Sequence, residues 1–143
     1  MRIIGLDLGS KTLGVSISDN IPMIASGVTT IRFSENNSKE ALKPLEEIVN
    51  EYNAKAFVLG LPKNMNNTMG PAAQRSYSFK KMLEDTFDLP VIMQDERLSS
   101  VAANNVLLKA DISRKKRKEK VDTIAATIIL QNYLDTRKEK QNE

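Results

Sequence analysis

The first eighteen residues, MRIIGLDLGSKTLGVSIS, constrain the fold more than any other part of the chain. Asp7 stands inside an apolar strand pattern, and the chain then reverses through a turn that contains glycine. An ionised carboxylate buried without a partner would cost several kcal/mol, so this position needs compensation. A metal cation is one form of compensation, and the hydrogen bonds of a structural turn are another.

The return segment, residues 13–18, alternates between two kinds of side chain. Leu13, Val15 and Ile17 are apolar, whereas the residues between them are glycine or serine. Strict alternation over this length is typical of a β-strand. The acid, the turn at residues 9–14 and the return strand therefore form one hairpin unit.

Composition limits the size of the protein and its chemistry. The chain has 143 residues, and 41% of them are hydrophobic, which is enough for the core of one domain. We expect that domain over residues 1–135, followed by a polar tail at residues 136–143. Cysteine and histidine are absent, which excludes disulfides, thiolate chemistry and imidazole metal ligands. Carboxylates, lysines, hydroxyls or metal-bound water must then carry any acid and base chemistry. The start of the chain resembles neither a signal peptide nor a membrane span, so we expect a cytoplasmic protein without membrane contact.

The rest of the chain alternates helices with strands, which predicts an α/β protein. A third strand is expected over residues 23–33, and short turns should make the first three strands antiparallel. The apolar run at residues 56–61 is typical of a strand covered on both faces, and residues 90–93 predict a fifth strand. Helices are expected near residues 45–52, 71–83, 99–108 and 120–134, the second opening at Gly70-Pro71.

Three acidic positions can converge in this layout. Asp7 lies in the first strand, Asp95 and Glu96 follow the fifth, and Asp122 stands in the first turn of the expected last helix. Helical spacing puts Asp122 on one stripe with Ala125, Ala126, Ile129 and Tyr133, which predicts that it faces the sheet. Carboxylates brought together repel unless cations lie between them, and hard divalent ions with oxygen ligands fit best. Two such ions are a known device for cleaving phosphodiesters.

Each of these residues also has a simpler interpretation. Asp122 in a first turn would favour the helix dipole by some tenths of a kcal/mol. Asp95, Glu96 and Arg97 together suit a solvated turn with an internal ion pair. Asp7 is the hardest to explain in this way because of its apolar neighbours, although a hydrogen-bonded structural role stays open.

Positive charge is concentrated between residues 109 and 120, although the net charge is only +3. The run comprises Arg114, Lys115, Lys116, Arg117 and Lys118. Its composition predicts a solvated, mobile loop. Such a loop also has affinity for phosphate backbones without reading their sequence.

The hairpin resembles two nucleotide-binding patterns in part. Residues 5–12, GLDLGSKT, nearly match a phosphate-binding loop, but that loop must open a helix, and here a strand follows. The same residues resemble the phosphate-contacting hairpin of actin-like and sugar-kinase ATPases. Those proteins need two such domains, and that interpretation leaves the other acids and the basic run unexplained.

Four segments in order resemble the YqgF, or RuvX, family of pre-16S rRNA nucleases and Holliday-junction-resolvase-like proteins. They are GLDLGSKTLGVSISD at 5–19, GLPKNMNNTMGPAA at 60–73, DERLSSVAA at 95–103 and DISRKKRKEKVDTIAATIILQNYL at 111–134. The match extends from residue 1 to about residue 134. Asn67 stands where the family usually has glycine, a small departure because asparagine also tolerates the left-handed conformation.

The resemblance implies an RNase H-like fold: a mixed sheet of three antiparallel and two parallel strands, with helices on both faces. It implies that Asp7, Glu96 or Asp95, and Asp122 bind magnesium or manganese, with two ions expected and Glu96 preferred within the acid pair. Lys11 in the turn and Arg97 are then candidates to hold phosphate oxygens.

By resemblance, the activity would be trimming of the 5′ end of pre-16S rRNA, a structured RNA. The residues themselves support a narrower statement, a metal-dependent phosphodiesterase acting on nucleic acid. Two alternatives stay open: a Holliday junction resolvase acting on branched DNA, for which a homodimer rather than a monomer is expected, and a non-catalytic RNA-binding module. The Gly70-Pro71 helix start is a further candidate phosphate contact.

Overall fold

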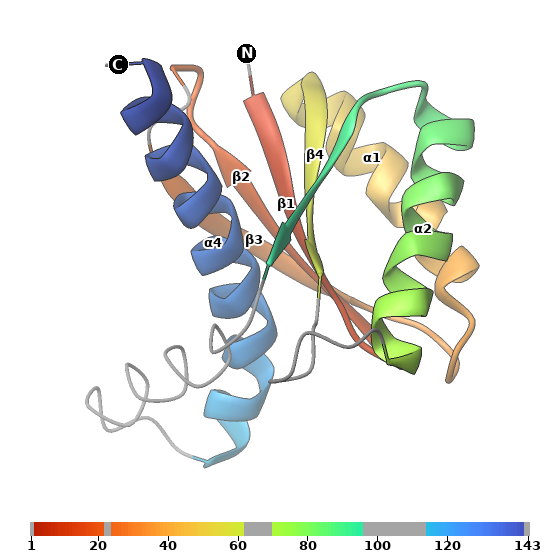
Figure 1. The fold of residues 1–143 in the computed structure, drawn as a ribbon. Helices are drawn as coiled ribbons and strands as arrows, with labels where there is room; N and C mark the ends of the chain where they lie inside the picture. The colour runs from red at the N-terminus through yellow and green to blue at the C-terminus, as the bar shows by residue number, and fades with distance from the viewer. Residues whose placement is uncertain (1, 22–23, 62–69, 96–113, 142–143) are drawn as a thin grey trace.

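The computed structural model describes residues 2–21, 24–61, 70–95 and 114–141 (Figure 1). The elements, in chain order, are β1 Arg2–Leu8, β2 Thr12–Ser18, β3 Ala25–Arg32, the short 3-10 helix η1 Ser38–Ala41, α1 Leu42–Tyr52, β4 Ala54–Leu61, α2 Pro71–Phe87, β5 Val91–Asp95 and α4 Arg114–Gln141. The predicted α/β organisation is confirmed. The helix expected near residues 99–108 lies outside the described residues.

The five strands form one mixed sheet in the order β3-β2-β1-β4-β5. The β1–β2 and β2–β3 pairs are antiparallel, as short turns require. The β1–β4 and β4–β5 pairs are parallel, with α2 as the crossover between β4 and β5. The predicted mixed sheet of three antiparallel and two parallel strands is therefore confirmed.

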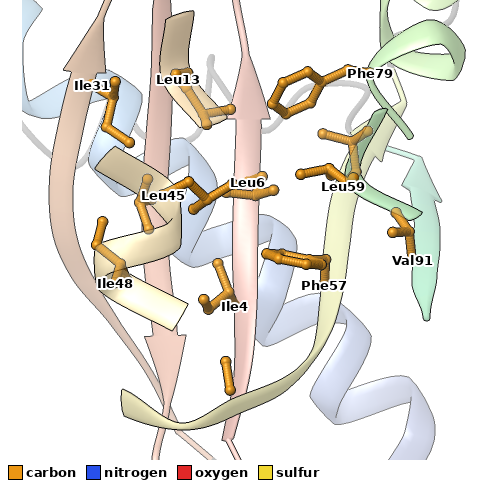
Figure 2. Close-up of a cluster of buried hydrophobic side chains, with 14 of the residues drawn as sticks. Ile4, Leu6, Leu13, Ile31, Leu45, Ile48, Phe57, Leu59, Phe79 and Val91 are labelled. Carbon is orange, nitrogen blue, oxygen red and sulfur yellow. The ribbon is translucent and has the colours of Figure 1, made fainter. Parts of the chain in front are cut away.

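One face of the sheet carries the larger core, which α1 and α2 cover. Its labelled members in Figure 2 come from all five strands and both helices: Ile4, Leu6, Leu13, Ile31, Leu45, Ile48, Phe57, Leu59, Phe79 and Val91. The alternation predicted for the return strand explains why Leu13, Val15 and Ile17 all belong to this core.

The opposite face is covered by α4, so the sheet has helices on both faces (Figure 1). A smaller cluster lies there: Ile3, Ala56, Val58, Ile129, Leu130 and Leu134. The serines of the return strand point to this face, and Ser16 and Ser18 are buried under the helix. Alternation in β2 therefore separates two buried faces, not a buried face from a solvated one.

The last helix begins earlier than predicted. It starts at Arg114, so the basic residues expected in a loop before residue 120 have helical backbone. Lysine, arginine and glutamate are good helix formers, and the helix contains neither glycine nor proline, so local propensity outweighs the repulsion between like charges. The helix also continues past residue 134 to Gln141. No helix among the described residues combines the length and the apolar character needed to cross a membrane.

Candidate functional site

Asp7 lies near the carboxyl end of β1, on the face that α4 covers. Side chains alternate along a strand, so Asp7 shares its face with Ile3 and Gly5. A Cβ added at Gly5 would stand 2.7 Å from Leu130 Cβ and 3.0 Å from the Ala126 carbonyl oxygen, which shows how closely β1 approaches α4. Asp7 is partly buried, so its carboxylate is neither a free surface group nor a core group.

A row of paired residues extends from Asp7 across two neighbouring strands. Asp7 pairs with Gly14 of β2, and Gly14 pairs with Thr30 of β3. Because Gly14 has no side chain, no side chain of this row lies between Asp7 and Thr30. Gly14, which lies within β2, therefore puts no side chain on the α4 face beside Asp7.

The same row is tied to α4. Thr30 Oγ1 lies 3.0 Å from Thr123 Oγ1, and the two hydroxyls share a hydrogen bond. One turn further along α4, the Ser16 hydroxyl donates to the Ala126 carbonyl oxygen at 2.9 Å. Because hydrogen bonds are directional, these two contacts fix the register of the helix over the sheet.

Asp122 immediately precedes Thr123, so its backbone stands at the level of the row that contains Asp7. Three members of the stripe predicted for this acid, Ala125, Ala126 and Ile129, are buried, as expected of a face turned to the sheet. The prediction that Asp122 occupies a first turn is wrong, because α4 begins eight residues earlier. A dipole effect fades within the first turn, so it does not explain an acid at this position.

The carboxyl end of β5, where the first acid of the predicted pair stands, lies beside the carboxyl end of β4. Asp95 ends the strand and pairs with Leu61 of β4, while Gln94 pairs with Gly60. Ile92 packs on the α4 face, and Met93 packs against the core on the other face. Alternation therefore places Gln94 on the same face as Asp7.

The remaining predicted site residues are distributed as follows. Lys11 is exposed in the β1–β2 turn, and Glu96 and Arg97 lie outside the described residues. The backbone of Arg114, Lys115, Lys116 and Arg117 forms the first turn of α4. Acidic side chains do not form a three-member metal cluster within the described part of the chain, which includes neither residue 96 nor the side chains at 95 and 122.

A groove of about 530 Å³, which we call the α2 groove, opens on the other side of the β1–β2 turn. Its apolar floor is formed by Leu8, Phe33 and Met82. Its polar rim includes Asn36 and Arg75, and the Arg75 Nη1 donates to the Asn36 Oδ1 at 3.2 Å. Neither residue is among those that the sequence patterns predict for the site. Asn36 has a left-handed backbone with φ of 59°, and the pair Asn36-Asn37 is a turn signal that could have pointed to this loop.

Hydrogen bonds hold the loop that carries Asn36 against the hairpin turn. The Phe33 N–H donates to the Lys11 carbonyl oxygen at 2.9 Å, and the Asn36 N–H donates to the Ser10 carbonyl oxygen at 2.8 Å. The Glu40 carboxylate stabilises this loop by accepting hydrogen bonds from residues 34 and 37. The hydrogen bonds from the Ser34 hydroxyl and then from the Ser34 backbone N–H lower the pKa of the Glu40 carboxyl. One wall of the α2 groove is therefore built by the turn that follows Asp7.

The helix start predicted at Gly70-Pro71 is confirmed. Gly70 has an extended backbone, and Pro71 takes the first helical position, where its missing N–H costs nothing. Figure 1 shows that the carboxyl end of β1 and the first turns of α2 and α4 lie toward the same end of the molecule. Asp7, the α2 groove and the backbone of the basic run thus share one end of the fold.

Two solved structures that share the fold are resolvases with the RNase H-like fold. The chain matches "T. thermophilus RuvC in complex with Holliday junction substrate" with a TM-score of 0.58 at 14% identity, covering 97% of this chain and 96% of that one. It matches the fowlpox virus resolvase, solved with Holliday junction DNA, with a TM-score of 0.58 at 15% identity, covering 96% and 99%. The predicted RNase H-like fold is therefore confirmed.

Comparison of sequences is more specific. Residues 1–136 match the family model described as "RuvX: Holliday junction resolvase", and the chain belongs to the RuvX family. A relative from Geobacillus sp. (strain WCH70) is 53% identical over 137 residues, covering 96% of this chain and 99% of its own. A relative from Bacillus subtilis (strain 168) is 48% identical over 136 residues, covering 95% and 99%. Both relatives carry the name "Putative pre-16S rRNA nuclease".

Proposed function

We propose that this protein is a metal-dependent phosphodiesterase that trims the 5′ end of the small-subunit ribosomal RNA precursor, in the cytoplasm. The observation that carries the proposal is the position of Asp7. Asp7 is a partly buried acid on the first strand, and its partner on the next strand, Gly14, has no side chain. The hydrogen bond between Thr30 and Thr123 holds the backbone of Asp122 at the same level of the sheet. The family and the names of its relatives supply the substrate class.

The donor set fits a hard divalent cation. Asp7, Asp122 and an acid after β5 would supply only carboxylate oxygens, the ligands that magnesium and manganese prefer. Within the pair Asp95-Glu96, Glu96 is the preferred ligand and Asp95 the alternative, as the resemblance to the family implies. Two bound ions would polarise the phosphate and lower the pKa of an attacking water.

The other residues of the proposal bind and orient the substrate. Lys11, which is exposed, would hold phosphate oxygens near the reacting group, and Arg97 is proposed for the same role. Charge-assisted hydrogen bonds of this kind are strong. Arg114, Lys115, Lys116 and Arg117 would neutralise more distant phosphates without reading sequence. In the reaction, water adds to phosphorus, the bond to the leaving sugar oxygen breaks, and that oxygen takes up a proton.

Asp7→Asn tests the proposal most directly. It should abolish magnesium-dependent cleavage of precursor RNA, while the melting temperature stays equal or rises, because clustered carboxylates no longer repel. Asp122→Asn should behave in the same way. Asp85→Asn on the exposed side of α2 is the matched control, and it should cleave like the wild type. Full activity of either site variant would refute the assignment of the acids.

A resolvase is the second candidate function, favoured by the description of the family model and by the fold of the two resolvases. Parallel assays on precursor RNA and on a four-way DNA junction, with magnesium, manganese or chelator, separate the two. Preferential cleavage of the junction by a homodimer would favour the resolvase, and cleavage of the RNA by a monomer would favour rRNA processing. Absence of both metal binding and cleavage would favour a non-catalytic RNA-binding module.

A further inference from the structure

We propose that the α2 groove holds one unpaired nucleotide of the RNA strand whose neighbouring phosphate lies at Asp7. This inference rests on the proposed function and adds to it a feature of the substrate: single-stranded character next to the cleaved bond.

The size and lining of the groove suit a nucleotide. Its volume is about 530 Å³, and cavities of roughly 300 to 1,000 Å³ hold single small-molecule groups. Phe33, Leu8 and Met82 give it an apolar floor with one aromatic ring, against which a flat base can stack. Asn36 and Gln74 bring amide groups to the rim, and amides can pair with the polar edge of a base.

Arg75 supplies a fixed positive charge on the same rim. It is half-buried, and its Nη1 donates to Asn36 Oδ1 at 3.2 Å. Its Nε is fully buried and has no hydrogen-bond partner among the described residues. A guanidinium has five N–H groups, so this one bond leaves capacity for a phosphate, which guanidinium binds well because the two shapes match.

The groove is connected to Asp7 by the chain itself. Leu8 follows Asp7 directly and points to the opposite face, where it contributes to the floor. Gly9, two residues from Asp7, lines the groove as well. Lys11 is exposed on the turn that lies between Asp7 and the α2 groove. An RNA strand that crosses this turn reaches the acid on one side and the groove on the other.

A base in the groove cannot be paired at the same time. Bases of a duplex are stacked and paired, whereas those of single strands can be turned out and bound on an aromatic ring. The groove therefore selects a single-stranded or distorted segment beside the cleaved bond. Regular duplex RNA should bind only through its backbone.

The experiment uses the full chain with Asp7→Asn, so that RNA is not cleaved, and follows the Met82 methyl signal by NMR. The ligands are uridine monophosphate, uridine, inorganic phosphate, a single-stranded tetranucleotide, and a duplex of the same sequence. We expect the tetranucleotide to shift the methyl signal most, the monophosphate less, and the duplex not at all. A shift with the free monophosphate alone would assign the groove to a free nucleotide and overturn the proposal, as would tetranucleotide binding that leaves the signal unmoved.

Two variants give a second readout. Arg75→Gln should weaken tetranucleotide binding by about tenfold, because a charge-assisted bond to phosphate is lost. Ser78→Leu should fill the groove, which Ser78 lines, and block binding without removing charge. Lys81→Gln removes the same charge from an exposed position of α2 and should change affinity little. Melting temperatures confirm that each variant folds.

The outcomes also separate this inference from the proposed function. If the wild type binds the tetranucleotide in the groove but cleaves no RNA with any metal, the nuclease proposal fails and the groove assignment stands. If the wild type cleaves RNA while Arg75→Gln and Ser78→Leu bind and cleave like the Lys81→Gln control, the groove assignment fails and the nuclease proposal stands.

Discussion

The face of the sheet under α1 and α2 is packed by the larger apolar core, whereas the face under α4 combines a smaller apolar cluster with a close glycine contact and side-chain hydrogen bonds. The first face buries Phe57 and Phe79 completely. The second brings Gly5 against α4 and ties the helix through hydroxyl contacts at Thr123 and Ala126. Apolar contacts are non-directional and supply free energy, whereas hydrogen bonds add little free energy but fix positions. The difference suggests that one face stabilises the domain and the other positions Asp7 relative to α4.

Truncation of the large core should have the largest effect on stability and the smallest on chemistry. Phe57→Ala leaves a cavity beside Phe87, whose ring centroid lies 5.3 Å away. It should lower the free energy of unfolding by about 3 to 5 kcal/mol. Denaturant unfolding measures the loss, and RNA cleavage below the unfolding transition should stay close to the wild-type rate. A large loss of cleavage in the folded variant would contradict the division between the faces.

Enlargement of a small residue on the other face should cost less stability and more activity. In Gly5→Ala the new methyl would meet the Ser16 hydroxyl, the Leu130 Cβ and the Ala126 carbonyl, so α4 must move away from β1. We expect a loss of about 1 to 3 kcal/mol in unfolding free energy. Cleavage should fall by roughly a hundredfold, because small displacements of reacting groups are costly. Unchanged cleavage would show that the spacing between β1 and α4 is not critical.

The smallest effect on stability is expected from removal of one hydroxyl contact. Thr123→Val keeps the shape of the side chain and deletes the bond to Thr30, at a cost of about 1 kcal/mol. Cleavage should fall further than this stability loss explains. Thr136→Val is the matched control, since among the described residues its hydroxyl donates within α4, to the Asn132 carbonyl oxygen. Equal cleavage by the two variants would remove Thr123 from the positioning role.

The parts of the fold with strong local patterns were predictable. Alternation at Leu13, Val15 and Ile17 predicts the return strand, and the apolar run at residues 56–61 predicts a strand buried on both faces. The start of α4 was predicted wrongly, because the cluster of like charges suggested a loop although each residue in it favours a helix. The same wrong start puts Asp122 in a first turn, where the helix dipole would explain an acid, whereas in the structure Asp122 lies eight residues into α4.

The candidate site was predictable in its acids but not in its groove. Asp7 is conspicuous because an acid interrupts an apolar strand. Asn36 and Arg75 are 39 positions apart and meet only when the loop after β3 folds against the hairpin turn. A contact between an ordinary loop asparagine and an ordinary helix arginine leaves no local pattern. Such a site follows from topology, which single-sequence patterns describe only in outline.

The early start of α4 changes how the basic run would act on a long substrate. The described contacts of α4 with the sheet reach Thr123, and nine residues precede it. At about 1.5 Å per residue the helix begins about 13 Å beyond that contact. Charges on a tether lose chain entropy when they bind, but charges on a continuous helix start from a defined separation. The length of the helix would then fix the distance between Asp7 and the phosphates that the basic run binds.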